Sequence, residues 1–129
     1  MIIDTSALIA ILFAELDAEI YARALATADR CRISAANYVE TAIVVEAQTR
    51  NSGSRDFDTF FRRAAIAIEP VTEEHAHLAR DAYVRFGKGR HRAGLNFGDA
   101  FAYALAKASG EPLLYKGKDF GKTDIRSAL

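Results

Sequence analysis

The stretch MIIDTSAL, residues 1–8, places an acid directly after a short apolar run and two hydroxyl side chains directly after the acid. The run Met1–Ile3 is typical of a short buried strand, and a helical pattern follows it. Asp4 is therefore expected at the carboxyl end of a strand and at the start of a helix. Thr5 or Ser6 can cap that helix or hydrogen-bond a carboxylate, which leaves Asp4 free for another role.

Short apolar runs and helical patterns alternate along the rest of the chain. Further strands are predicted at 33–36, 67–71 and 113–115. The spacing of apolar residues predicts helices at 7–13, 16–28, 37–50, 57–64, 73–86 and 99–109, with a polar break at 51–54 and Gly110 as the last stop. Strands that alternate with helices indicate an α/β fold with a parallel sheet covered on both faces. The 129 residues show no linker, so a single domain covering 1–129 is expected.

The composition fits an ordinary globular protein. Half of the residues are hydrophobic, 26% are charged, and 17 basic residues balance 17 acidic ones. A polyanionic partner is therefore to be sought in local charge clusters and not in the net charge. The single Cys31 excludes an internal disulfide. No apolar run reaches the ~20 residues of a membrane span, and no signal peptide is recognisable, so a cytoplasmic protein without membrane association is expected.

Three further acids are predicted to meet Asp4 at one edge of the sheet. Ligands of open parallel sheets bind at the carboxyl ends of the strands. Glu40 lies about one turn into the helix after the second strand, Asp99 follows a Gly-rich segment, and Asp119 follows the last strand. Carboxylates that gather at one edge repel each other, and a hard divalent cation with oxygen ligands relieves that repulsion.

Such a site suits Mg²⁺ and metal-assisted attack of water on a phosphodiester. Asp4 and Asp99 are the predicted direct ligands, because short side chains at the ends of elements hold an ion rigidly. Glu40 is expected to reach the ion directly or through a water, and Asp119 to complete the ring. Taken singly, each acid has a simpler explanation as a helix cap, a helix-dipole partner or a solvated residue. Their shared position is what predicts the site.

The segment GKGRHRAGLNFGD, residues 87–99, carries a local positive cluster in a nearly neutral chain. Its glycines allow the backbone to approach a ligand closely. Four of its side chains are candidates for contacts with nucleic-acid phosphates: Lys88, Arg90, His91 and Arg92. A solvated charge run that only keeps the protein soluble is the alternative.

These motifs together resemble the PIN domain, and within it the VapC-type toxins of bacterial toxin–antitoxin pairs. The resemblance rests on MIIDTSAL, on Glu40 within AANYVETAIV, and on LNFGDAFAYALAKASGEPLLYKGKDF near the end, in this order. It covers essentially the whole chain. It implies a three-layer α/β/α sandwich around a short parallel sheet of four to five strands. It also implies Mg²⁺- or Mn²⁺-dependent ribonuclease activity.

The resemblance assigns roles to particular residues. Asp4, Glu40 and Asp99 match three acids of the family's ring, and Thr5 and Ser6 match the hydroxyls that follow its first Asp.

The fourth acid departs from the pattern of many relatives. They often carry two acids, one residue apart, before the Phe of this motif, and here Gly117 stands in the first of those positions. Asp119 is the predicted fourth acid, and Asp124 is the alternative.

The resemblance also implies partners. VapC-type toxins generally form homodimers and cleave structured RNA, commonly tRNA or ribosomal RNA. A cognate antitoxin inhibits them by inserting a segment near the acidic pocket. An RNA substrate, an antitoxin and a second copy of the chain are therefore expected. Three aromatic residues are expected in the core or at an apolar interface: Phe57, Phe60 and Phe61.

Two other functions stay open from the residues alone. The missing acid at 117 permits a catalytically silent module that binds RNA or a protein partner. An Asp after a first strand also suits a phosphoryl-accepting receiver or a phosphatase. Such a phosphatase usually has a second Asp two residues on, where Ser6 stands. A receiver usually has an early pair of adjacent acids, which Ile3 and Asp4 do not supply.

Overall fold

The computed structural model of this chain describes residues 1–49 and 54–129, and its strands form one parallel sheet. The strands are β1 (Ile2–Ile3), β2 (Arg32–Ser34), β3 (Ala67–Glu69) and β4 (Leu113–Leu114). They are arranged in the order β3-β2-β1-β4, and every pair is parallel. Because β1 lies between β2 and β4, the chain leaves an inner strand of the sheet at Asp4.

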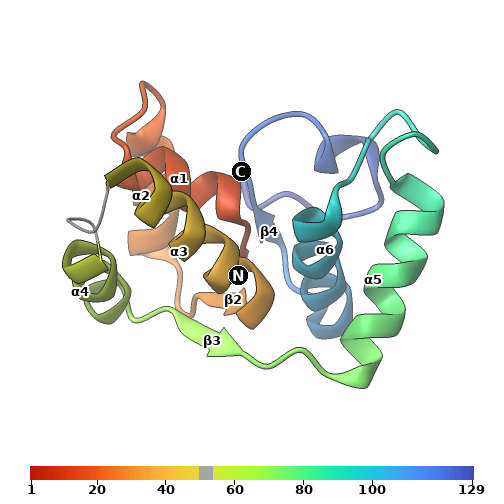
Figure 1. The fold of residues 1–129 in the computed structure, drawn as a ribbon, viewed down its shortest axis with the longest axis horizontal. Helices are drawn as coiled ribbons and strands as arrows, with labels where there is room; N and C mark the ends of the chain where they lie inside the picture. The colour runs from red at the N-terminus through yellow and green to blue at the C-terminus, as the bar shows by residue number, and fades with distance from the viewer. Residues whose placement is uncertain (50–53) are drawn as a thin grey trace.

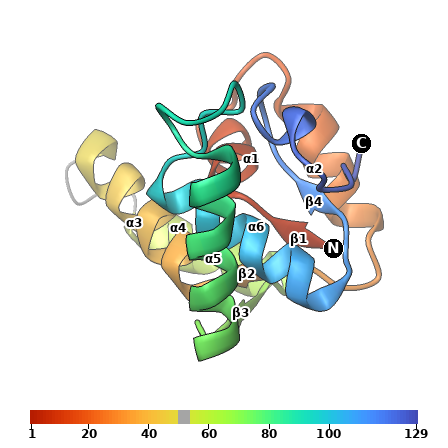
Figure 2. The same ribbon diagram turned by 90° about the vertical axis from the view of Figure 1, so that its right-hand side faces the viewer.

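Helices cover both faces of this sheet. They are α1 (Thr5–Leu12), α2 (Ala18–Thr27), α3 (Ala35–Thr49), α4 (Ser54–Ala64), α5 (Glu73–Phe86), α6 (Phe97–Ser109) and the 3₁₀ helix η1 (Phe120–Lys122). The first four helices share one hydrophobic core, and α5 and α6 share another on the opposite face (Figures 1 and 2). This confirms the three-layer α/β/α arrangement. Within the described ranges, no helix has the length and apolarity needed to cross a bilayer.

Strands of only two residues hold the layers together. Ile3 and Leu114 pack into the core on the side of α1, whereas Ile2 and Leu113 pack against α6. All four side chains are fully buried. Successive side chains of a strand point to opposite faces. Both faces are covered here, and therefore the first strand is apolar at every position instead of alternating with polar residues.

Several element boundaries differ from those predicted. β3 ends at Glu69, because the next residue, Pro70, has no N–H to donate to a neighbouring strand. α6 begins at Phe97 and not at 99, because Asn96 provides its N-cap. Gly110 ends α6 as predicted, in a left-handed conformation at φ +67°. The predicted polar break at 51–54 and the predicted helix end at 50 lie outside the described residues, apart from the start of α4.

The aromatic residues of α4 belong mainly to the core. Phe57 and Phe61 are buried, and their rings pack against the ring of Tyr38 on α3, with centroids 5.3 and 5.0 Å away. Phe60 is half-buried beside Phe61. The expectation that these residues supply an apolar interface is therefore wrong for Phe57 and Phe61, and the core alternative is correct.

Candidate active site

Asp4 caps α1 with one carboxylate oxygen and keeps the other free. Its Oδ2 accepts hydrogen bonds from the backbone N–H (2.9 Å) and the hydroxyl of Ser6. Its Oδ1 is buried and, among the described residues, has no hydrogen-bond partner. The expectation that Thr5 or Ser6 caps this helix in place of Asp4 is wrong, because the carboxylate itself does so. The free oxygen nevertheless leaves Asp4 able to bind a ligand.

The free oxygen of Asp4 lies in an unfavourable electrostatic environment. Burial raises the pKa of Asp4 to about 6, although the two hydrogen bonds from Ser6 oppose the shift. The negative charges of Asp99 and Glu40 raise the pKa further. A buried carboxylate without a compensating charge is costly. The arrangement therefore favours a cation at this position.

Glu40 is held in place from three sides. The hydroxyl of Thr5 donates to its Oε2 at 2.6 Å, and the side-chain amide of Asn37 donates to the same oxygen at 3.3 Å. Gly98 of α6 packs against this carboxylate so closely that a Cβ at position 98 would overlap it. The predicted supporting role of Thr5 therefore has a physical basis, because its hydroxyl orients Glu40.

Asp99 lies in the first turn of α6, where it also stabilises the start of the helix. Its Oδ2 accepts the backbone N–H of Asn96, and the side chain of Asn96 accepts the backbone N–H of Asp99, each at 2.9 Å. Burial raises the pKa of Asp99, and the charges of Glu40 and Asp119 add to this effect against the opposing Asn96 hydrogen bond. Electrostatic coupling therefore links Asp99 to Asp4, Glu40 and Asp119.

The two candidates for the fourth acid lie in different surroundings. Asp119 is exposed, and its nearest cation is Lys122 at 3.6 Å. Asp124 accepts a hydrogen bond from Tyr103 (2.7 Å) and pairs with Lys107 (2.9 Å) and Arg85 (3.6 Å). Partial burial raises the pKa of Asp124, but hydrogen bonds from Lys107 and Tyr103 bring it below its usual value. Asp119 therefore remains the candidate, because the chain's own cations already neutralise Asp124.

The donor set fits a hard divalent cation. It consists of carboxylate oxygens that raise each other's pKa and includes the free, buried Oδ1 of Asp4. Within residues 1–49 and 54–129, no three acidic, His or Cys side chains are close enough together to form a complete ligand group. Mg²⁺ is typically held by one or two carboxylates together with waters and substrate phosphate, so a partial protein ligand set suits it.

The basic loop is held by backbone hydrogen bonds and leads into the start of α6. Residues 87 and 95 form a β-bridge, in which the Lys88 N–H donates to the carbonyl of Leu95. Lys88, Arg90 and Arg92 are exposed. His91 is half-buried, its ring packs edge-on against Phe86 with centroids 5.2 Å apart, and its Nδ1 accepts the N–H of Ala93. His91 thus shapes the loop, and the three exposed cations are available to a phosphate backbone.

Sequence reasoning missed two residues that organise this region. Asn37 is fully buried, and its amide donates to the carbonyl of Gly98 (3.0 Å) as well as to Glu40. Its position three residues before Glu40 places both on one helix face, which is a signal that the sequence does contain. Lys116 follows β4, and its backbone N–H donates to the hydroxyl of Ser6 at 2.9 Å. The sequence contains no comparable signal for Lys116.

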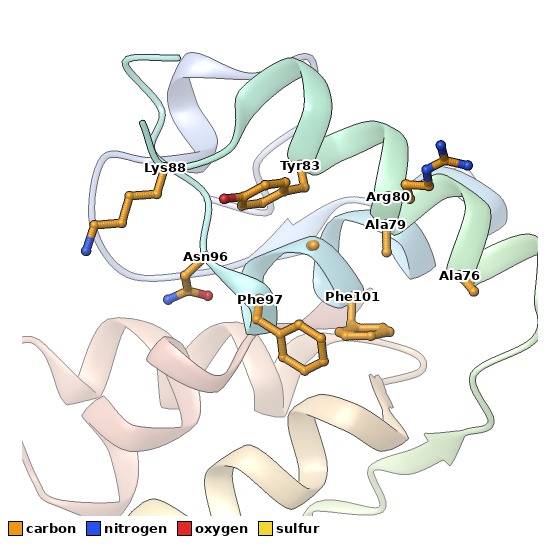
Figure 3. A pocket seen from close by; sticks show the side chains of 9 residues that line it. Ala76, Ala79, Arg80, Tyr83, Lys88, Asn96, Phe97 and Phe101 are labelled. Atoms are coloured by element: carbon orange, nitrogen blue, oxygen red, sulfur yellow. The ribbon is translucent and has the colours of Figure 1, made fainter. Parts of the chain in front are cut away.

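An apolar groove of about 600 Å³ lies between α5 and α6, apart from the four acids (Figure 3). Phe97 and Phe101 lie side by side at its edge, with ring centroids 4.9 Å apart, and Phe97 is 79% exposed. The other lining residues are Ala76, Ala79, Arg80, Tyr83, Lys88, Asn96 and Ala100. An exposed aromatic side chain beside an apolar groove is typical of an interaction surface.

Known proteins resemble this chain along nearly its whole length. The family model described as PIN domain matches residues 1–126. A protein named Ribonuclease VapC from Mycolicibacterium smegmatis (strain ATCC 700084 / mc(2)155) is 53% identical over 125 residues, which cover 97% of both chains. Ribonuclease VapC28 from Mycobacterium tuberculosis (strain ATCC 25618 / H37Rv) is 55% identical over 130 residues, covering 100% of this chain and 98% of the relative.

Solved structures share the fold at low sequence identity. Mycobacterium tuberculosis VapC20, described as a sarcin-ricin loop cleaving toxin, superposes with a TM-score of 0.73 at 20% identity, covering 96% of this chain and 95% of that one. A chain of a toxin–antitoxin complex from Klebsiella pneumoniae gives a TM-score of 0.70 at 18% identity, covering 95% and 92%. At these identities the likeness supports the architecture alone.

Proposed function

This chain belongs to the PIN-domain family, in its VapC-type branch, and we propose that it is an endoribonuclease acting as the toxin of a toxin–antitoxin pair. The observation that carries the proposal is the buried Asp4 carboxylate, which has one free oxygen and is coupled to Glu40 and Asp99 at the carboxyl edge of the sheet. The curated relatives with 53% and 55% identity are named ribonucleases. Family membership also argues against the receiver and phosphatase alternatives.

We assign Asp4, Glu40 and Asp99 as the residues that would hold Mg²⁺ or Mn²⁺. Such an ion, when bound, would lower the pKa of a water and offset the negative charge that develops on the phosphate. Ser6 orients Asp4 so that Oδ2 is occupied and Oδ1 is free. Thr5 fixes the Glu40 carboxylate. Asp119 is exposed and interacts electrostatically with Asp99, and we assign to it the orienting of a water or the completion of the acidic ring.

The RNA is proposed to bind along the basic loop. Lys88, Arg90 and Arg92 are exposed on a segment that leads directly into the first turn of α6, where Asp99 lies. Phosphate contacts of this kind position a nucleic acid without reading its sequence. Structured RNA is the proposed substrate class, and VapC20, which has the same fold, is described as cleaving the sarcin-ricin loop.

An antitoxin and a second copy of the chain are the proposed protein partners, in a cytoplasmic setting. Exposed apolar side chains support the second copy: Phe97 is 79%, Ile43 63% and Val39 52% exposed. These residues replace Phe57 and Phe61 as candidates for the dimer interface. Light scattering tests this assignment, because Phe97→Ser should lower the molar mass of a dimer to that of a monomer while Phe60→Ser leaves it unchanged.

The proposed activity is tested by mapping RNA ends after brief expression of the wild type and of Asp99→Asn. New 5′ ends at defined positions of a structured RNA are expected only with the wild type. Purified protein should produce the same ends with Mg²⁺ or Mn²⁺ and none with EDTA. If the wild type generates no new ends and binds no divalent ion, the alternative of a silent RNA- or partner-binding module is favoured.

A further inference from the structure

Lys116 joins three parts of the chain at the edge of the acidic site. It lies two residues after β4 (Leu113–Leu114), at the start of the loop that carries Asp119. Its backbone N–H donates to the Ser6 hydroxyl, which in turn donates to Oδ2 of Asp4. Its ammonium group pairs with Asp17 at 2.6 Å and with Glu15, both in the turn between α1 and α2. Lys116 therefore connects the loop that carries Asp119 to Ser6 through its backbone and to the α1–α2 turn through its side chain.

The conformation and packing of residues 117–120 make these contacts of Lys116 important for the position of Asp119. Gly117 adopts φ +102°, a conformation that side-chain-bearing residues rarely take, and it turns the chain directly after the anchor. On the other side of Asp119, the ring of Phe120 is 2% exposed and packs against Tyr115. Asp119 itself is exposed, and among the described residues its side chain forms an ion pair only with Lys122, at 3.6 Å. The position of Asp119 therefore depends on the contacts of Lys116 before it and of Phe120 after it.

We propose, on the basis of the proposed function, that Lys116 is a positioning residue that fixes the loop carrying Asp119 opposite Asp99 and holds Ser6 against Asp4. The side chain of Lys116 is 34% exposed, and ion pairs of this kind contribute little to overall stability. Loss of the ammonium group is therefore expected to loosen the loop without unfolding the protein.

Lys116→Met tests the proposal against a matched control. Lys107→Met removes a lysine of similar exposure (38%) that pairs with Asp124 instead. Lys116→Met should lower the rate of RNA cleavage at saturating Mn²⁺ by about ten-fold, because Asp119 is displaced relative to Asp99. Amide hydrogen exchange at 117–121 should accelerate, with α6 unchanged. Lys107→Met should change neither quantity, and Lys116→Arg should restore both.

Two results would overturn the proposal. One is a folded Lys116→Met protein that cleaves RNA as fast as Lys107→Met does. The other is unchanged exchange at 117–121. Failure of the proposed function would differ, because Asp4→Asn would then leave Mn²⁺ binding and RNA cleavage unchanged while the exchange difference at 117–121 persisted. The double variant Glu15→Gln with Asp17→Asn should reproduce the exchange result of Lys116→Met, since it removes the same ion pairs from the other side.

Discussion

Glu111 at the amino end of the parallel sheet and Asp4 at its carboxyl end lie in opposite electrostatic surroundings. At the amino end, Glu111, which precedes β4, pairs with Arg32 of β2. Partial burial raises the pKa of Glu111, but hydrogen bonds from the N-terminal ammonium and from Arg32 bring it below its usual value. At the carboxyl end, Asp4 is bonded by Ser6 alone among the described residues, and burial raises its pKa to about 6.

This difference separates an acid that supports the fold from the acid that we propose as a metal ligand. Glu111 is neutralised by cations of the chain, so its ionised form is stable in the folded protein. Asp4 has no such partner in the part of the chain that the structure describes, and the acids that couple to it carry the same charge. A fold retains an uncompensated buried charge at a cost to stability, and such groups cluster at functional sites.

The largest expected effect comes from replacing each of these two acids separately by its amide. Asp4→Asn should lower RNA cleavage by more than the roughly 100-fold that loss of an outer partner of a metal ligand can cost. Glu111→Gln should leave cleavage nearly unchanged and lower the free energy of unfolding by about 1–3 kcal/mol, because Arg32 loses an ionised partner. Cleavage assays and urea denaturation of both variants measure the two effects.

The opposite pattern would contradict the comparison. If Asp4→Asn cleaves at the wild-type rate, the free oxygen at the carboxyl end has no catalytic importance. If a folded Glu111→Gln protein loses cleavage, the two ends of the sheet are not functionally separate.

The second expected effect is a dependence of stability on pH that arises from Asp4. Its pKa is raised from 3.8 to about 6 in the folded state, so the folded protein binds more protons than the unfolded chain between these values. The free energy of unfolding should therefore fall as the pH rises from about 4 to 7 without divalent ions. A shift of this size corresponds to about 3 kcal/mol.

Asp4→Asn isolates this contribution. The variant should lose the decrease that Asp4 causes and be more stable than the wild type at pH 7. Added Mn²⁺ should raise the melting temperature of the wild type but much less that of Asp4→Asn. A wild type whose stability relative to Asp4→Asn is the same at pH 4 and pH 7 would show that Asp4 is not destabilised in its ionised form.

The position of Asp4 was predictable because it follows from local sequence and one topological rule. An apolar run that ends in an acid places that acid at a strand end, and the carboxyl ends of parallel strands meet at one edge. The same rule predicts that Glu40 and Asp99 lie near Asp4, and the electrostatic coupling of the three acids agrees with it. Their roles as ligands stay a prediction.

The contacts of the site were not predictable, because they join distant parts of the chain. Lys116 and its partner Asp17 are 99 positions apart. The apolar spacing predicts a start of α6 two residues too late, because it does not reveal the Asn96 cap and Asp99 lies in the first turn. The α4 aromatics illustrate the same limit, since a helical stripe does not indicate whether it faces the core or a partner.

The third expected effect concerns the close approach of α6 to Glu40. Gly98→Ala adds a Cβ that would overlap the Glu40 carboxylate, so the carboxylate or the helix must shift. Cleavage should fall about ten-fold, because the acids are displaced relative to each other.

Gly110→Ala is the matched control at the other end of α6, where φ is +67° and no atom crowds the new methyl group. It should cost about 1 kcal/mol of stability and leave cleavage unchanged. Equal activities of the two variants would indicate that the α6–Glu40 contact is not important for the site.

The smallest expected effect concerns the basic loop at 87–95. Arg90→Ala should weaken RNA binding several-fold and reduce the dependence of log Kd on log salt by about one charge, because one phosphate contact is lost. The wild type and the variant should cleave at similar rates at saturating RNA, since Arg90 does not contact the acids in the described residues. Arg23→Ala on α2 removes an exposed arginine paired with Glu19 and should change neither affinity nor salt dependence. Fluorescence anisotropy with a structured RNA at several salt concentrations measures both quantities. If Arg90→Ala keeps the wild-type salt dependence, the loop does not contact RNA and only keeps the protein soluble. A reduced slope in this variant alone would show that the basic loop contacts the RNA that the acidic edge is proposed to cleave.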